Sequence, residues 1–266
     1  MFIRFLGIEL KKALFNRVFA SIILLLSICF FIDFYFNFLK VINDPWYDKK
    51  AMYFSFNYYI GTGPSQFRII FLLLLPLIVC MPYALSHLND RKINYQLFLL
   101  TRISFWKYYL GKMIAVFCSG ILITVYPFIL SFIIINILMP IRITNLTNVE
   151  GLVVLRSLLP EHPLKYMVIY MVITGLFGGI IAVFTMCTSM LINHKFIAMI
   201  FPFLLSLIYG FIVETFGKPN YEPHILADPS QPIVTITWNC IIGVGVVMFI
   251  ISIIGNYVGM KKHARI

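Results

Sequence analysis

Residues 87–113, HLNDRKINYQLFLLTRISFWKYYLGKM, separate two apolar runs that are each long enough to cross a lipid bilayer. The first run extends from Phe67 to His87, and the second extends from Tyr109 to Leu138. The stretch itself carries five Lys or Arg residues. A basic connection between two long apolar runs is typical of a loop in a multi-pass membrane protein, so this stretch indicates the class of fold.

The composition of the whole chain leads to the same class. Hydrophobic residues make up 61% of the 266 residues, charged residues make up 12%, and the mean hydropathy is +0.94. Soluble domains contain roughly 45–50% apolar and about 25% charged residues. We therefore expect an all-α integral membrane protein with one membrane domain, and a first span that is not a cleaved signal peptide.

Apolar stretches predict six transmembrane helices. A hydrocarbon core about 30 Å thick needs roughly 20 residues of helix. The stretches that satisfy this length are Val18 to Leu39, Phe67 to His87, Tyr109 to Leu138, Tyr166 to Ile192, Phe196 to Val213 and Ile233 to Val258. Because six is an even number, both termini should lie on the same side of the membrane.

The distribution of basic residues predicts the orientation. Of the 21 Lys and Arg residues, 13 fall on the side that carries the termini and 8 fall on the other side. Cytoplasmic loops carry the excess of basic residues, so we expect a protein of the cell membrane with both termini in the cytoplasm. The formal net charge of +11 then suits contact with anionic lipid and does not indicate nucleic-acid binding.

Glycines and prolines occur at defined positions within the predicted spans. Gly175 and Gly179 are four residues apart, as are Gly255 and Gly259. This spacing lets helix backbones approach closely, either within one chain or, as the alternative, between subunits. Four prolines favour kinks because proline lacks the backbone donor: Pro76, Pro82, Pro127 and Pro202.

The basic loop has two faces if it is helical. One face is apolar and contains Ile93, Leu97 and Leu100. The other face combines cations with aromatic rings and contains Arg91, Tyr95, Phe98 and Arg102. Two interpretations are open: an interfacial helix whose basic residues contact lipid phosphates, or a docking helix whose aromatic and Arg side chains anchor a cytoplasmic partner.

Three segments resemble those of the transmembrane subunits of ABC-2 type exporters. The segments are FIRFLGIELKKALFNR at 2–17, NDRKINYQLFLLTRIS at 89–104 and YYLGK at 108–112. The resemblance implies six spans, an N-terminal amphipathic connecting helix and a cytoplasmic coupling helix. It also implies that two copies of the chain form a homodimer and that a separate ATPase subunit binds ATP and Mg.

The resemblance assigns roles to two regions outside the spans. Residues 1–17 would be the connecting helix on the inner leaflet, with the basic residues Arg4, Lys11 and Lys12. Its apolar face would contain Phe2, Leu6, Leu10 and Ala13, and Glu9 is placed to pair with Lys12. Residues 18–266 would form the six-span domain. Its coupling loop, 89–108, would include a coupling helix from Asn89 to Leu100 that contacts the ATPase through Arg91, Tyr95, Phe98 and Arg102.

The chain lacks the usual enzyme motifs. The LGK sequence at 110–112 lacks the upstream Gly and the following Ser or Thr of a phosphate-binding loop, and neither HExxH nor GxSxG occurs. The His residues are scattered and the Cys residues lie in apolar runs, so we expect no catalytic activity, no metal site and no cofactor bound by this chain. Asp33 and Glu214 lie near span ends and are interpreted as interfacial anchors or, alternatively, as parts of a gate or proton-linked step.

The sequence favours a permease subunit of an ATP-driven exporter. The spans are rich in aromatic residues and poor in charge, which suits an amphipathic cargo, and the chain most resembles Gram-positive permeases that export membrane-active peptides such as phenol-soluble modulins or antimicrobial peptides. Possible path-lining residues, each with helix packing as the alternative, are Ser119, Tyr126, Thr185, Ser189, Ser206 and Tyr209. Other hypotheses remain: an ATP-independent sensor or scaffold, a membrane-embedded enzyme, or an ABC-2 exporter of drugs or lipid-linked glycans.

Overall fold

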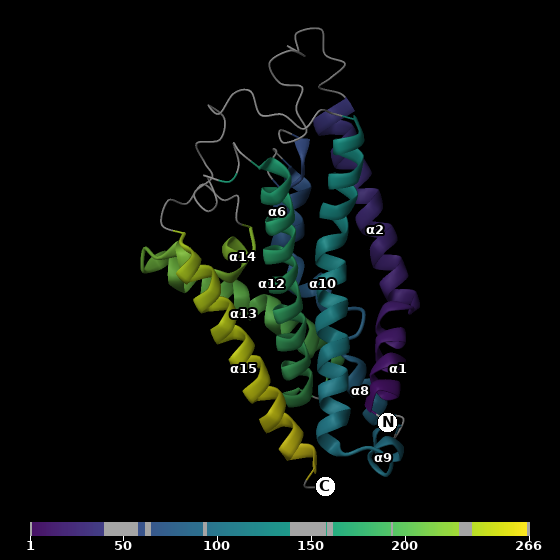
Figure 1. Cartoon of the computed structure of the whole chain (residues 1–266). Coiled ribbons are helices and arrows are strands. Elements are labelled where there is room, and N and C mark those ends of the chain that lie inside the picture. The colour runs from purple at the N-terminus through teal and green to yellow at the C-terminus, as the bar shows by residue number, and fades with distance from the viewer. Residues whose placement is uncertain are drawn as a thin grey trace, which may run out of the picture.

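The computed structural model describes residues 2–39, 58–61, 65–92, 95–138, 158, 162–192, 194–228 and 236–264. Within these residues every regular element is a helix (Figure 1). The predicted all-α class is therefore confirmed for the part of the chain that the structure describes.

Five helices are long and apolar enough to cross a membrane. At a rise of 1.5 Å per residue, even the shortest of them, with 21 residues, is about 32 Å long. The five are α2 (Arg17–Phe34, extended by the π-helix η1, Tyr35–Leu39), α10 (Phe105–Leu138), α12 (Pro163–Leu191), α13 (Lys195–Thr215) and α15 (Trp238–Ala264). A multi-pass membrane protein is thus confirmed, with five of the six predicted spans present as long helices.

The second predicted span is not one continuous helix. It is divided into α6 (Gln66–Leu73) and α7 (Leu75–Cys80), and a turn over residues 81–85 leads to α8 (Ser86–Lys92). Two of the predicted proline kinks account for these breaks, because Pro76 lies in the first turn of α7 and Pro82 lies in the turn that follows. In contrast, Pro127 and Pro202 lie inside helices that continue past them.

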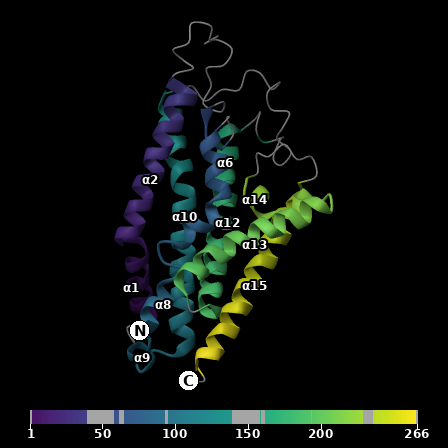
Figure 2. The same ribbon diagram turned by 180° about the vertical axis from the view of Figure 1, so that it is seen from behind.

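The first helix, α1 (Phe2–Leu14), packs lengthwise against α10. Figures 1 and 2 show α1 below α2 and beside the lower part of α10, so it runs along the bundle and not across its end. This differs from the expected connecting helix lying flat on the inner leaflet. The reason is that α10, at 34 residues, is about 51 Å long and extends well beyond a 30 Å core, which leaves a lateral surface for α1.

The start of α1 and the end of α15 lie at the same end of the bundle, which we call the terminal end (Figures 1 and 2). The short helices α8 and α9 (Tyr95–Leu100) lie there too. At the opposite end, η3 (Pro219–Tyr221) and α14 (Pro223–Leu226) follow α13. Both short helices begin at a proline, a residue favoured at the first position of a helix.

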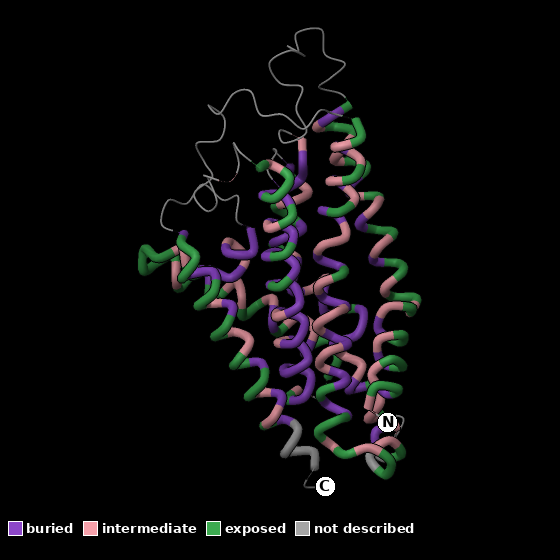
Figure 3. The backbone as a smooth tube through the Cα atoms, in the orientation of Figure 1, coloured by how far each residue is buried: buried purple, intermediate pink, exposed green. Residues whose placement is uncertain are grey.

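The helix α12 is the centre of the bundle. Two thirds of its most apolar window (67%) is buried, against 17% for α2, and the burial colours in Figure 3 show the same contrast. Glycines allow this close packing: a Cβ built on Gly179 would lie 2.7 Å from the Phe117 ring of α10, and one on Gly259 would lie 2.7 Å from Cβ of Met190. Both glycine pairs therefore serve packing within the chain, as the first of the two interpretations predicts.

We expect opposite effects when two glycines are replaced by Ala. A Cβ on Gly120 of α10 would lie 2.8 Å from the carbonyl oxygen of Gly178, so Gly120→Ala should lower the free energy of unfolding by about 1–3 kcal/mol. Gly243 of α15 has no heavy atom within 4 Å of its built Cβ, so Gly243→Ala should raise that free energy by up to about 1 kcal/mol. Thermal unfolding of both variants in detergent micelles tests the pair, and a loss of stability in both would contradict the prediction.

A group of polar contacts lies at the end of the bundle opposite the terminal end. The carboxylate of Asp228, which is 1% exposed, is 3.3 Å from Nε of Arg68, and Tyr170 donates a 2.6 Å hydrogen bond to the same carboxylate. Arg68 also donates to the backbone carbonyls of Ile60 and Gly61, at 3.2 and 2.9 Å. These bonds join the chain near residue 60, α6, α12 and the segment after α14 into one unit.

Asp33 joins α2 to the start of α6. Its carboxylate accepts hydrogen bonds from the Ser65 hydroxyl at 2.9 Å and from the backbone N–H of Phe67 at 3.3 Å. Ser65 is in turn the N-cap of α6. These contacts give Asp33 an anchoring role between two helices, while Glu214 is exposed at the end of α13.

Candidate functional site

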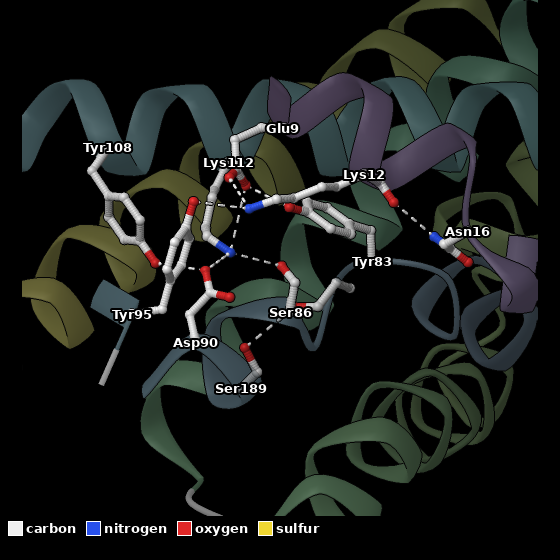
Figure 4. A network of polar contacts seen from close by, with 11 residues as sticks. Glu9, Lys12, Asn16, Tyr83, Ser86, Asp90, Tyr95, Tyr108, Lys112 and Ser189 are labelled. Atoms are coloured by element: carbon white, nitrogen blue, oxygen red, sulfur yellow. Dashed lines mark hydrogen bonds and ion pairs between the residues drawn. The ribbon is translucent and has the colours of Figure 1, made fainter. Parts of the chain in front are cut away.

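A buried group of charges joins α1, α8 and α10 at the terminal end (Figure 4). Glu9 of α1 and Lys112 of α10 are both 0% exposed. Asp90 of α8 completes the core of the group, and its side chain is 14% exposed. We call Glu9, Lys12, Asp90 and Lys112 the charge cluster.

Lys112 is the centre of the charge cluster. Its Nζ lies 2.6 Å from Oδ2 of Asp90 and 3.6 Å from Oε2 of Glu9, and it donates a 3.1 Å hydrogen bond to the Ser86 hydroxyl. The ammonium therefore contacts α1 on one side and the α8 segment on the other. Since Gly111 precedes it and the Phe5 ring occupies the space where a Gly111 side chain would be, α1 lies close enough to α10 for these contacts.

Tyrosine hydroxyls donate hydrogen bonds to the two carboxylates of the cluster. Tyr83, in the turn before α8, donates to Oε2 of Glu9, and Tyr108 of α10 donates a 3.1 Å bond to Oδ2 of Asp90. Their rings also lie near Lys112, with centroids 5.2 and 5.6 Å from Nζ. A buried ion pair contributes to stability only when such additional hydrogen bonds offset its desolvation, and this cluster has them.

Lys12 extends the cluster to α9. Its Nζ is 3.4 Å from Oε1 of Glu9, donates a 3.2 Å hydrogen bond to the Tyr95 hydroxyl and lies 4.3 Å from the centre of that ring. Burial lowers the pKa of Lys12, but the Tyr95 hydroxyl and the Glu9 carboxylate outweigh burial and raise it above its ordinary value. Lys12 is thus a cation at neutral pH, and the cluster contains two basic and two acidic side chains.

The junction between α1 and α2 is attached to the same region. Asn16 caps α2 by accepting a 2.7 Å hydrogen bond from the backbone N–H of Phe19. Its amide nitrogen donates to the carbonyl of Pro82 at 3.3 Å. The turn before α8 is thus bonded to the junction of α1 and α2 through Asn16, and α8 is bonded to α10 through Lys112.

The predictions for α1 are confirmed in part. The expected Glu9–Lys12 pair is present, and Arg4 and Lys11 are exposed. The packed face differs from the predicted one: it consists of Phe5, Glu9 and Ala13, while Phe2, Leu6 and Leu10 are half-buried. The reason is electrostatic, since Glu9 turns toward the buried Lys112 and thereby rotates the helix away from its purely apolar face.

The predicted coupling residues divide into two pairs. Phe98 is 71% exposed and Arg102 is exposed, so both are accessible to a partner on the surface around α9. Tyr95 and Arg91 are half-buried, and Tyr95 faces Lys12. The predicted single helix from Asn89 to Leu100 corresponds to α8 and α9. Ile93 and the side chains of Leu97 and Leu100, which would form its apolar face, lie outside the described residues.

The structure places the six possible path-lining residues in different environments. Ser119, Thr185 and Ser189 are buried and donate to backbone carbonyls of their own helices, at 2.9, 3.0 and 2.7 Å. Tyr126 shares a 2.6 Å hydrogen bond with Ser27 of α2. The remaining two, Ser206 and Tyr209, line a cleft of about 570 Å³ between α13 and α15.

The sequence analysis did not single out Asp90 and Lys112 as buried partners. Lys112 entered only through the count of basic residues and through the YYLGK and LGK sequences. A signal was present, because an ionisable side chain inside an apolar helix is costly and usually finds a partner of opposite charge. The chain offers two acids at this end of the bundle, Glu9 and Asp90.

No known protein family, curated protein or solved structure matches the chain.

Proposed function

We propose that this chain is the permease subunit of an ATP-driven exporter, and that α9 with the turn after it docks on a separate ATPase subunit. The observation that carries the proposal is the combination of an exposed Phe98 and Arg102 with the charge cluster directly behind them. An aromatic ring beside an Arg is the usual chemistry of an interface anchor. The cluster would transmit movement of this surface to α10.

The proposal includes a sixth membrane crossing and a dimer. The segment α6–α7 would be the sixth crossing, because α2 ends at one end of the bundle and α8 lies at the other (Figure 1). The terminal end would then face the cytoplasm, in accordance with the excess of basic residues on that side. Two copies of the chain would enclose the translocation path, and the partner subunits would bind ATP and Mg.

The proposed cargo is an amphipathic, membrane-active peptide. The support comes from the resemblance to peptide exporters and from spans that are rich in aromatic residues and poor in charge. A cargo of this kind can enter from the lipid without crossing a polar channel. Stimulation of the ATPase activity of the purified complex by amphipathic helical peptides, but not by scrambled peptides of equal composition, is the expected result.

The test of the docking proposal is a pair of matched double variants. Phe98→Ala with Arg102→Glu should reduce the amount of ATPase subunit that co-purifies in mild detergent by about 30-fold, since a loss of about 2 kcal/mol at an anchor has that effect. Phe196→Ala with Lys195→Glu changes the same kinds of exposed residue at the start of α13, also at the terminal end, and should leave co-purification unchanged.

The outcomes separate the hypotheses. If the unaltered chain, crosslinked in the membrane of its native host, brings down no protein with nucleotide-binding motifs, the exporter proposal is wrong and the ATP-independent sensor or scaffold is favoured. If a partner co-purifies equally well with both double variants, the partner docks on another surface than α9.

A further inference from the structure

The cleft between α13 and α15 has an uneven distribution of polar groups. Its walls come from α7, α12, α13 and α15, and its volume is about 570 Å³. The polar side chains that line it lie on α13, η3, α14 and the start of α15, mainly toward the end away from the termini: Ser206, Tyr209, Tyr221, His224 and Asn239. The rest of the lining is largely apolar and includes Pro76, Ile181 and Ile251.

The cleft opens toward the surface that faces lipid. Val247 and Ile251 of α15 are 55% and 51% exposed, and Leu205 of α13 is 40% exposed. Its floor is formed by buried residues that include Leu72 and Pro202. From Asn239 to Ile251 the cleft follows α15 for about 18 Å, which is more than half of a 30 Å hydrocarbon core.

The shape and lining of the cleft favour an alkyl chain as the occupant. The cleft follows α15 for about 18 Å and offers polar side chains mainly toward one end. The polar face of an amphipathic peptide helix would be left without partners along the apolar remainder of the cleft. An extended alkyl chain is one methylene wide, has no polar groups to satisfy and can lie lengthwise.

We propose that this cleft binds one acyl chain of a membrane phospholipid, in the leaflet opposite the terminal end. The chain lies along α15 toward Ile251, and the glycerol ester region lies beside Tyr209 and Asn239, which offer hydrogen bonds. His224 contributes a further polar group: burial lowers the pKa of its imidazole, and its Nδ1 lies 2.6 Å from Oε1 of Glu222. The site therefore suits the ester region of a lipid, and it does not depend on the proposed ATPase partner.

Photolabelling in vesicles tests this site. The probe is phosphatidylglycerol with a diazirine near the end of one acyl chain, incorporated with the purified full chain. After irradiation and digestion, mass spectrometry should show much more label on the α15 peptide around Met248 and Ile251 than on the exposed face of α2.

Two variants fill the cleft, and a third is their control. Gly243 lines the cleft and has no heavy atom within 4 Å of a built Cβ, so Gly243→Phe should reduce the α15 label to the level of α2, as should Val247→Trp. Val246→Phe adds the same bulk on an exposed part of α15 that does not line the cleft, and it should leave the label unchanged.

Three results would overturn the proposal. The first is an α15 label in the unaltered chain that is no stronger than the α2 label, which would mean bulk lipid only. The second is a label that neither cleft-filling variant lowers. The third is a label that an amphipathic helical peptide displaces completely, since the peptide would then be the occupant. None of these results bears on whether an ATPase docks at α9.

Discussion

Replacing Lys112 by Met is expected to lower the free energy of unfolding by about 3–5 kcal/mol, the usual cost of removing one partner of a buried ion pair. Lys112 is 0% exposed and lies between the carboxylates of Glu9 and Asp90. Its loss leaves the carboxylate of Asp90 without its 2.6 Å ion-pair partner in a buried setting. The fall in melting temperature should be on the order of 10 °C.

The chain contains its own reporter for this measurement. Cys80, Cys187 and Cys240 are buried free thiols, so a thiol-reactive fluorescent dye signals unfolding in detergent micelles. Lys107→Met is the matched control, because Lys107 is exposed on the same helix, and its melting temperature should stay close to that of the unaltered chain. Equal destabilisation by both substitutions would show that the charge itself, and not the buried pairing, matters.

A double-mutant cycle separates pairing from packing. If Glu9 and Lys112 are coupled, Glu9→Gln should cost much less in the Lys112→Met background than in the unaltered chain, with a difference on the order of 1–3 kcal/mol. Simple additivity of the two substitutions would refute the coupling. The same cycle bears on the proposed function: if an ATPase subunit docks at Phe98, breaking the cluster should leave docking intact and remove the contact between α8 and α10.

The helical class and most of the spans were predictable because burial in lipid leaves a strong signal. Long apolar runs give α2, α10, α12, α13 and α15 within a few residues of their observed bounds. Hydropathy does not reveal the break in the second span, since the run around Pro76 and Pro82 is as apolar as the others. These prolines predict kinks because proline lacks the backbone donor, but Pro127 and Pro202 lie inside continuous helices, so a proline alone does not distinguish a break from a continuous helix.

The site was predictable only in its local parts. Glu9 and Lys12 are three residues apart on one helix, so their pairing follows from helix geometry. The pairing of Glu9 with Lys112 depends on α1 running along α10, which the amphipathic pattern of α1 does not reveal. An apolar face of a helix is equally satisfied by a lipid surface and by another helix, and the choice between them depends on tertiary packing.

The second large effect is expected at the opposite end of the bundle, where Asp228→Ala should lower the free energy of unfolding by about 3 kcal/mol or more. Asp228 is 1% exposed and binds both Arg68 and Tyr170. The Ala variant removes the carboxylate that pairs with Arg68 and accepts the hydrogen bond from Tyr170. Asp228→Asn should cost less, because the amide oxygen still accepts the 2.6 Å hydrogen bond from Tyr170.

The order of the variants distinguishes an ion pair from a general loss of packing. We expect stability to fall from the unaltered chain through Asp228→Asn to Asp228→Ala, while Glu214→Ala, an exposed acid at the same end, has little effect. Combining Arg68→Met with Asp228→Leu removes both charges and should restore part of the loss, since a buried pair replaced by apolar residues leaves no unpaired ion. A double variant less stable than Asp228→Ala would show instead that the bonds of Arg68 to the carbonyls of Ile60 and Gly61 hold this end together.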